Sequence, residues 1–413
     1  MSSFLKNMGL MTLSILLTLG MLEVAVRVMR LGTGGFWEPN DQLGWVNIPN
    51  ANGWESCYGE CQVQVSINSL GMRDTETTYE KEDGQQRILF LGDSITAGMQ
   101  VPLEDTFTEQ LEDHLADAGD WEVLNGAVNG YGTDNELLYY RLEGHKFDPD
   151  VVVVGIYLAN DIYNNSRVLE LRTGGESHKP YFTFDNDGEL VLNNFPVENT
   201  DTVGIKIGTF LKKHFQLPRF IAQTMSLRGE VPGWLRPIVT LFSGNRGVRA
   251  EDTSEEPAES DNTSAETGDE NEELADQQRA VSRTDATICD EEYTPEIEEA
   301  WAITKAVLLQ LKEEVEESGA ELAVVSVPTT AQTITPRANA TWYCERPNQE
   351  LNTFLEEEDI PYLDLLQPFR DYSDEGGRAL YYARDFHMNE AGHHLAGEEI
   401  FKFIDETFLS ESE

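Results

Sequence analysis

One serine stands where a nucleophile would be expected. Ser94 follows the apolar run 88–91 through the turn Gly92-Asp93, and residues 95–98 favour a helix. This pattern predicts a buried parallel strand that ends at the carboxyl edge of a sheet, where open α/β folds bind ligands. A serine hydroxyl there could attack an ester carbonyl, provided that a base takes its proton and hydrogen-bond donors stabilise the oxyanion.

Three further polar segments also carry residue types that such chemistry needs. Residues 125–133 contain Gly130, residues 158–161 contain Asn160, and residues 385–389 contain His387. The first two directly follow predicted strands. Ser, Gly, Asn and His in this chain order resemble the SGNH family of hydrolases, also called GDSL-type lipases and esterases. The segments lie between residues 88 and 392, so the resemblance covers the whole catalytic domain.

The resemblance implies a role for each residue. Ester hydrolysis by a serine needs a base, an acid that orients the base, and oxyanion donors. Ser94 is expected to be the nucleophile, His387 the base and Asp385 the orienting acid. The oxyanion hole would be formed by the backbone N–H groups of Ser94 and Gly130 and by the side-chain amide of Asn160. A Cβ at position 130 would crowd a substrate that touches the backbone.

Two segments depart from the family pattern. The family usually has Asp-x-x-His, whereas here Arg384 stands three residues before His387 and Asp385 stands two before. In an extended segment, residues two apart lie on the same side, which allows Asp385 to serve. The family usually has Gly-x-Asn-Asp, whereas Leu158 occupies the glycine position here.

Neighbouring polar residues are predicted to support the site rather than to react. Asp93 would cap the helix that follows it, and Asp161 would fasten its loop. His393 and His394 fall in the first turns of the last helix, where we expect exposure to solvent. No cluster of His, Cys and carboxylate residues has metal-ligand spacing around the strand ends, so no metal and no cofactor are indicated.

Alternating strands and helices predict an α/β fold. They imply a five-stranded parallel sheet covered by helices on both faces, which is a flavodoxin-like three-layer sandwich. Such a fold alone implies no function. The predicted strands cover residues 88–91, 122–124, 151–157, 322–328 and 360–366.

The N-terminal region contains an apolar run over residues 7–26, broken only by Glu23. Twenty helical residues span about 30 Å, the thickness of a bilayer core. We therefore predict a single transmembrane anchor. A cleaved signal peptide, which would release a secreted protein, is the alternative, but no small-residue cleavage site follows. Lys6 on one side and Arg27 and Arg30 on the other leave the orientation open.

The four cysteines give an indication of compartment. With an export-like segment present, they allow two disulfides, and the simplest pairing joins Cys57 to Cys61 and Cys289 to Cys344. A zinc site formed by the four is the less favoured alternative. Disulfides would place the catalytic domain outside the cytoplasm.

The sequence divides into parts of different composition. We expect a tail at 1–6, an anchor at 7–27, an extended preface at 28–86 that could cover a sheet edge, and a hydrolase domain at 87–413 with an insertion at about 163–293. Within the insertion, residues 203–249 are basic and apolar, and the acidic stretch 251–292 is predicted to be disordered. The basic part could lie on anionic headgroups, form a flap over the site, or pack on the core.

The overall charge excludes some partners. A formal net charge of −46, from 75 acidic and 29 basic residues, argues against nucleic acid as a partner because phosphates would be repelled. Such an excess also suits a protein that stays hydrated in high salt, where charge repulsion is screened. A salt-loving source is therefore a hypothesis.

These observations predict a membrane-anchored, extracytoplasmic serine hydrolase that cleaves esters through an acyl-enzyme. The substrate would be an ester, such as an acylated glycan or lipid, with acetyl on carbohydrate as the first candidate. One alternative is a carbohydrate O-acyltransferase of the same architecture. Another is an SGNH-like binding module that has lost activity.

Overall fold

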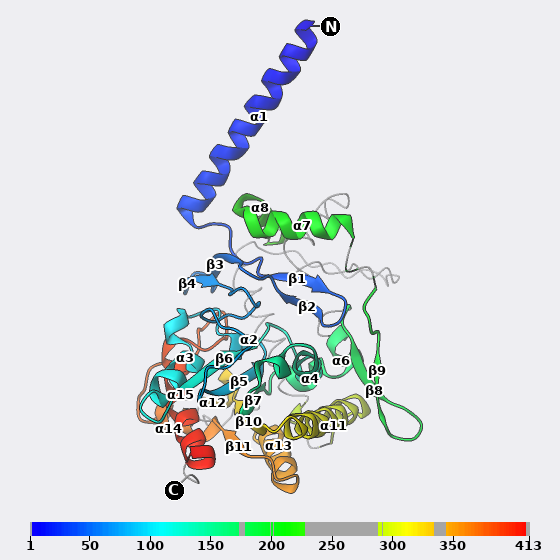
Figure 1. The fold of residues 1–413 in the computed structure, drawn as a ribbon, viewed down its shortest axis with the longest axis vertical. Helices are drawn as coiled ribbons and strands as arrows, with labels where there is room; N and C mark the ends of the chain where they lie inside the picture. The colour runs from blue at the N-terminus through cyan, green and yellow to red at the C-terminus, as the bar shows by residue number, and fades with distance from the viewer. Residues whose placement is uncertain are drawn as a thin grey trace, which may run out of the picture.

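A five-stranded parallel sheet organises the chain (Figure 1). In this computed structural model the described residues are 2–172, 178–198, 200, 202–227, 288–290, 292–333 and 344–409. The strand order is β11-β10-β7-β5-β6, which confirms the predicted flavodoxin-like topology. The strands are β5 (Gln86–Gly92), β6 (Trp121–Asn125), β7 (Val151–Tyr157), β10 (Glu321–Val327) and β11 (Tyr362–Asp364).

The side chains of β5 show why both faces of the sheet are covered. Ile88 and Phe90 belong to one core cluster, whereas Leu89 and Leu91 belong to another. Successive residues of a strand point to opposite faces, so an uninterrupted apolar strand needs a helical layer on each side. The cluster of Leu89 and Leu91 includes residues of α4 (Thr133–Leu142), α11 (Pro295–Glu317) and α13 (Arg346–Glu357). The cluster of Ile88 and Phe90 includes residues of α3 (Phe107–Leu115), α14 (Leu366–Asp374) and α15 (Glu390–Ile404).

The preface forms two antiparallel pairs that stay separate from the main sheet. They are β1 (Trp37–Asn40) with β2 (Gly44–Asn47), and β3 (Asn52–Ser56) with β4 (Gln62–Ser66). Phe36, Ile48 and Val65 of the preface share a core cluster with Ala97 and Ala127. The preface therefore packs on α2 (Ser94–Ala97) and on the loop that follows β6. It also contacts β6, an edge strand of the sheet, as expected: Asp74 Oδ2 accepts from Asn125 N over 2.8 Å, and Thr77 Oγ1 donates to Glu122 Oε1 over 2.5 Å.

The remaining described elements are short, and several of them lie in the insertion. These elements are α2 (Ser94–Ala97), η1 (Leu103–Asp105), η2 (Gly144–Phe147), α5 (Asp161–Asn164), α6 (Arg167–Arg172), β8 (Tyr181–Phe184), β9 (Leu190–Asn193), α7 (Val203–His214), α8 (Gln216–Leu227), α12 (Thr330–Thr333) and η3 (Asp405–Leu409). Most of the acidic stretch 251–292 lies outside the described residues, so its predicted disorder stays a prediction.

The N-terminal helix α1 (Ser2–Met29) projects away from the rest of the molecule (Figure 1). Among the described residues, it is the helix that is long and apolar enough to cross a bilayer, with a mean hydropathy of 1.9 over its candidate window. By length and composition a signal sequence would meet the same criteria. Two disulfides, Cys57–Cys61 and Cys289–Cys344, are present in the structure.

Candidate active site

Ser94 begins a helix at the end of β5. A Cβ on Gly92 would lie 2.3 Å from Thr96 Oγ1, so the strand can turn tightly into α2 only with glycine at this position. Asp93 caps α2, because its Oδ1 accepts from Ile95 N over 2.8 Å. Ser94 itself is half-buried, unlike the fully buried Asp93 before it.

His387 and Asp385 lie in line with Ser94. His387 Nε2 is 2.9 Å from Ser94 Oγ, and His387 Nδ1 is 2.6 Å from Asp385 Oδ1. A carboxylate on Nδ1 favours the proton on that nitrogen and leaves the Nε2 lone pair for the serine hydroxyl. The structure thus brings together the three residues for which the sequence predicted nucleophile, base and acid.

A tight loop carries both His387 and Asp385. Tyr382 N donates to His387 O over 2.9 Å, and Phe386 N donates to Tyr382 O over 3.1 Å. Phe386 has a φ of +63°, a left-handed conformation that costs a residue with a side chain roughly 1–2 kcal/mol. Such a loop keeps its shape only if the surroundings hold it.

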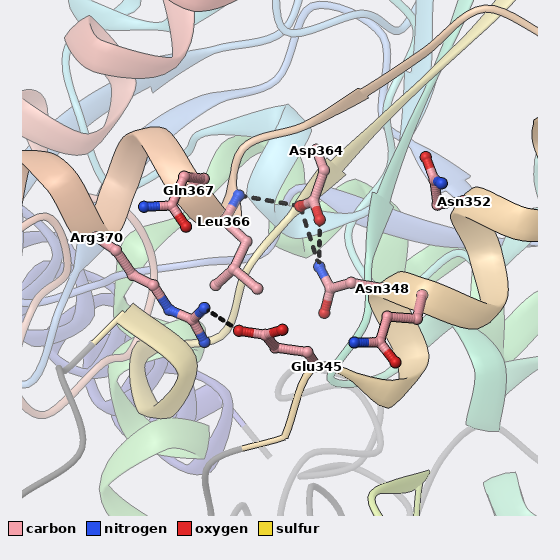
Figure 2. Close-up of a pocket in the computed structure, with 8 residues that line it drawn as sticks. Glu345, Asn348, Asn352, Asp364, Leu366, Gln367 and Arg370 are labelled. Atoms are coloured by element: carbon pink, nitrogen blue, oxygen red, sulfur yellow. Dashed lines mark hydrogen bonds and ion pairs between the residues drawn. The ribbon is translucent and has the colours of Figure 1, made fainter.

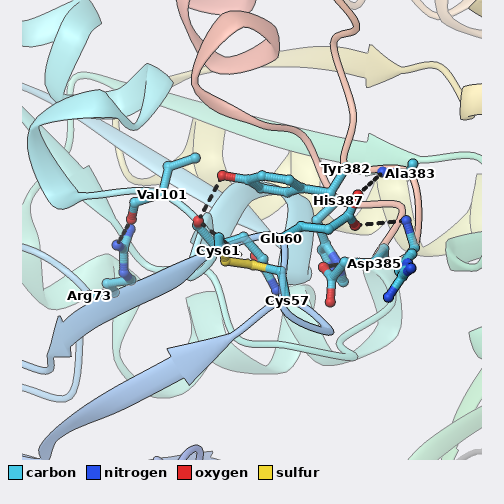
Figure 3. Close-up of a disulfide and its surroundings, with 11 residues drawn as sticks. Cys57, Glu60, Cys61, Arg73, Val101, Tyr382, Ala383, Asp385 and His387 are labelled. Carbon is cyan, nitrogen blue, oxygen red and sulfur yellow. Dashed lines mark hydrogen bonds and ion pairs between the residues drawn. A yellow bond between two sulfur atoms is a disulfide. The ribbon is translucent and has the colours of Figure 1, made fainter. Parts of the chain in front are cut away.

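The preface supplies a brace for this loop (Figure 3). Glu60 lies within the Cys57–Cys61 disulfide loop, and its carboxylate accepts from Ala383 N over 3.0 Å and from Arg384 N over 2.7 Å. Sequence reasoning missed Glu60. The closely spaced cysteines around it were the only signal, and they indicated a compartment rather than a contact with the site.

The loop after β6 carries Gly130 to the same edge of the sheet. Val128 N donates to Gly92 O over 3.1 Å, and Asn164 Nδ2 donates to Gly130 O over 3.2 Å. Gly130 has a φ of +81°, which favours glycine. A Cβ there would meet only Trp45 Cζ2, at an ordinary 3.5 Å. Within the protein, backbone conformation rather than crowding therefore accounts for the glycine.

Asn160 lies just after β7, beside the turn that leads to Ser94. Its Nδ2 donates to Asp93 Oδ2 over 3.0 Å. An amide nitrogen carries two hydrogens, so this bond leaves one N–H for a ligand. Leu158, which replaces the usual glycine of this segment, is fully buried, and the strand-to-loop connection remains intact around it.

Buried carboxyl groups underlie these loops. Burial raises the pKa of Asp93, although Ile95 N–H, the Asn160 amide and the charge of His387 oppose the rise. Asp161 Oδ2 accepts from Tyr157 N over 2.7 Å, which is the loop-fastening contact expected of it. Burial, with the Asp93 charge second, raises the pKa of Asp161 well above its usual value. Burial, again with the Asp93 charge second, does the same for Glu136.

The expectation for His393 was wrong. This residue is 1% exposed, its ring stacks on Phe107 with centroids 5.6 Å apart, and its Nδ1 accepts from Phe107 N over 3.3 Å. Burial lowers the pKa of His393 to about 3, and the charges of Arg73 and His387 act in the same direction. The first turn of α15 packs on α3, which the helical pattern alone did not reveal. His394 is exposed, as expected.

Within the parts of the chain that the structure describes, no group of three or more His, Cys, Asp and Glu side chains is arranged to hold a metal ion. The zinc site considered from the cysteines does not form, because all four are joined in disulfides.

Fold and site together define an α/β protein with a Ser–His–Asp constellation where the strand order reverses. Residues 90–173 match the GDSL-like Lipase/Acylhydrolase family, and residues 289–413 match the SGNH hydrolase-like domain described as acetyltransferase AlgX. The first segment carries Ser94 and the second carries His387. The two segments that carry the candidate site are thus each similar to SGNH/GDSL-type hydrolase domains.

Individual relatives are distant or match only in part. An arylesterase of Vibrio mimicus is 39% identical over 79 residues, which are 18% of this chain and 38% of that protein's length. A solved acetylxylan esterase mutant from Geobacillus stearothermophilus is 11% identical over 77% of this chain and 94% of its own, with a TM-score of 0.37. A GDSL-like lipase from Bacteroides thetaiotaomicron is 10% identical over 78% and 89%, with a TM-score of 0.33.

Proposed function

We propose that this chain is a serine hydrolase that cleaves carboxylic esters through an acyl-enzyme. The observation that carries the proposal is the line of short contacts from Ser94 Oγ to His387 Nε2 (2.9 Å) and from His387 Nδ1 to Asp385 Oδ1 (2.6 Å). Both distances suit proton transfer and its orientation. The match to the GDSL-like Lipase/Acylhydrolase family supports the same type of reaction.

The reaction would proceed in two half-reactions. Ser94 Oγ attacks the ester carbonyl carbon while its proton passes to His387 Nε2, and Asp385 stabilises the imidazolium. The oxyanion accepts from the Ser94 and Gly130 N–H groups and from the second amide N–H of Asn160. The imidazolium then protonates the leaving alcohol as the carbon–oxygen bond breaks. Water attacks the acyl group on Ser94 by the same route and releases the acid.

Acetyl esters of carbohydrate are the substrates to test first. The match of residues 289–413 to a domain described as an acetyltransferase supports an acetyl group, and the partial match to an arylesterase supports ester cleavage. The acetyltransferase description also favours the second candidate, a carbohydrate O-acyltransferase. In that reaction a sugar hydroxyl replaces water in the second half-reaction.

The proposed setting is a membrane surface outside the cytoplasm. The apolar helix α1 supports an anchor at residues 7–27, and the two disulfides support an oxidising compartment for the preface at 28–86 and the hydrolase domain at 87–413. A secreted form released by signal cleavage is the alternative.

Activity-based labelling tests the function directly. A fluorophosphonate should modify the wild-type chain, peptide mapping should locate the label on Ser94, and Ser94→Ala should abolish it. A correctly folded wild type that resists labelling would favour the inactive binding module. Product analysis with an acetylated donor and a polysaccharide acceptor then separates the two reactions: free acetate indicates hydrolysis, and acetylated acceptor indicates transfer.

A further inference from the structure

Helix α7 turns its apolar face outward. Val203, Ile207 and Phe210 lie on one face at helical spacing and are 74%, 55% and 56% exposed. The buried residues of this helix are Gly208 and Lys212. A surface helix of a globular protein normally buries its apolar side chains against the core. The reverse arrangement in α7 indicates that an apolar surface outside this chain covers them.

Polar contacts hold the other face of α7 against the preface. Lys213 Nζ donates to Pro49 O over 2.6 Å. Glu38 of β1 lies opposite the same face: burial raises the pKa of Glu38, whereas Thr209 and the charges of Lys213 and Lys212 lower it. Helix α7 cannot rotate its apolar stripe inward without breaking these interactions.

Helix α8 is fastened in a similar way. The Arg219 guanidinium donates to Lys212 O over 2.5 Å and to Gly34 O over 2.9 Å, and this side chain is 2% exposed. Phe215, between the two helices, and Ile221 of α8 remain 39% and 46% exposed. We call Val203, Ile207, Phe210, Phe215 and Ile221 the outer apolar face.

The end of α1 is attached to the turn between α7 and α8. Glu23, the residue that interrupts the apolar run, accepts from Gln216 N over 2.9 Å and from Leu217 N over 2.8 Å. Arg27 Nη2 donates to His214 O over 2.6 Å. The two helices therefore lie at the level where the apolar part of α1 ends, and Figure 1 shows them across the α1 side of the globular part.

We propose that the outer apolar face lies in the headgroup–acyl boundary of the phospholipid bilayer that α1 enters. An amphipathic helix fixed beside a membrane span, with its apolar side chains directed away from the protein, suits that boundary. This inference rests on the proposed membrane anchor. The globular part would then sit on the bilayer in one orientation rather than swing on a flexible tether.

The local charge agrees with a lipid surface as the partner. Residues 203–227 contain no acidic residue, in a chain whose net charge is −46. Of their basic side chains, Lys206 is exposed, whereas Lys212 and Arg219 are buried on the side of the preface. Anionic headgroups attract basic segments next to a membrane span and repel acidic surface. This segment without acidic residues lies next to α1 and could approach such headgroups without repulsion.

Depth-dependent quenching on the full-length chain tests the proposal. Single cysteines at Leu13→Cys, Ile207→Cys or Thr353→Cys would carry an environment-sensitive fluorophore, because the native cysteines are all disulfide-bonded. The protein is reconstituted in vesicles of phosphatidylcholine and phosphatidylglycerol. We expect lipids spin-labelled deep in the chain to quench position 13 and lipids labelled near the headgroup to quench position 207. Only aqueous iodide should quench position 353, on the exposed side of α13.

Each alternative outcome is distinguishable. If position 13 is in lipid while position 207 is quenched by iodide as strongly as position 353, the inference is wrong and the anchor stands. If position 207 is shielded from both iodide and lipid quenchers, a second copy or another protein covers the face, and the inference is again wrong. If position 13 is itself open to iodide, the anchor fails and the inference fails with it.

A second variant tests the face itself. Phe210→Asp, combined with the label at position 207, should remove quenching by headgroup-region lipids and restore quenching by iodide. Hydrolysis of a small water-soluble ester should be unchanged, because α7 contributes no residue to the proposed catalytic set. Undiminished lipid quenching in this variant would contradict the inference.

Discussion

The loops that carry Ser94 and His387 are built in different ways. Ser94 directly follows the buried strand β5. Gly92 allows the tight turn into α2, and Asp93, the residue before Ser94, caps that helix. The His387 loop contains a left-handed Phe386 and is braced by Glu60, which is 323 positions from Ala383 along the chain. One loop is shaped by its sequence neighbours, whereas the other depends on a contact from the preface.

This difference predicts that substitutions in the two loops lower activity in two different ways. Changes on the Ser94 side should remove reacting or charge-stabilising atoms. Changes to the brace on the His387 side should leave every reacting atom present and lower the fraction of molecules in which the imidazole is aligned. Activity measurements on matched variants can tell these apart.

Removal of the reacting groups should have the largest effect. Ser94→Ala and His387→Ala are each expected to lower kcat for p-nitrophenyl acetate roughly 10⁶-fold, and Asp385→Ala about 10⁴-fold, because the three groups act as one unit. Circular dichroism should show that each variant is folded. Unchanged turnover in folded His387→Ala would remove that residue from the mechanism.

Loss of one oxyanion donor should rank next. Asn160→Ala should lower kcat about 100- to 1000-fold, because one side-chain amide no longer stabilises the developing charge. Asn164→Ala is the matched control: it loses a bond to Gly130 O but no proposed oxyanion donor. Equal losses in the two variants would mean that Asn160 acts only by holding its loop.

Removal of the brace should have a smaller and different effect. Glu60→Ala deletes both acceptors of Ala383 N and Arg384 N, so we expect kcat to fall about 10- to 100-fold through misalignment, with KM little changed. Glu60→Gln, which keeps one acceptor oxygen, should recover part of the loss.

Exposed Glu82 provides the control, and Glu82→Ala should behave as wild type. If Glu60→Ala retains full kcat, the preface does not position His387. If Glu60→Ala instead raises KM alone, Glu60 affects substrate binding rather than the catalytic loop.

The same contrast explains how far the sequence could lead. The apolar runs and the Gly-Asp-Ser turn are local patterns, so they predicted the strands of the sheet. The order of Ser, Gly, Asn and His along the chain resembles that of a known family, and this resemblance predicted that His387 lies next to Ser94. The strand ends shifted by at most two residues, as for residues 360–366 against Tyr362–Asp364.

Contacts between distant segments were beyond the same reasoning. The brace from Glu60, the burial of His393 under α3, and the position of the preface over the site loops each depend on tertiary packing that no local pattern encodes. The preface was expected to cover a sheet edge, and its residues Asp74 and Thr77 do contact the edge strand β6. Its apolar residues also share a cluster with Ala97 and Ala127, a contact that the sequence did not predict.

The buried carboxyl groups under the Ser94 loop should affect stability more than activity. Neither oxygen of Glu136 has a hydrogen-bond partner among the described residues. Burial, with the charges of Asp93 and Asp134, raises the pKa of Glu136 well above 4.5. A raised folded-state pKa means that the native state binds the proton more tightly than the unfolded state. Above pH 4.5 this group therefore makes the free energy of unfolding fall as pH rises, until the pH passes its folded-state pKa.

Glu136→Gln should remove this dependence, because the neutral amide does not titrate. The free energy of unfolding, measured by denaturant between about pH 5 and 8, should fall less steeply in the variant, by up to about 1.4 kcal/mol per pH unit. Glu143→Gln, at a more exposed carboxylate next to α4, is the matched control for the loss of one carboxylate from this part of the chain. A variant slope equal to that of wild type would mean that Glu136 is charged in the folded protein and that another group carries the proton beneath Ser94.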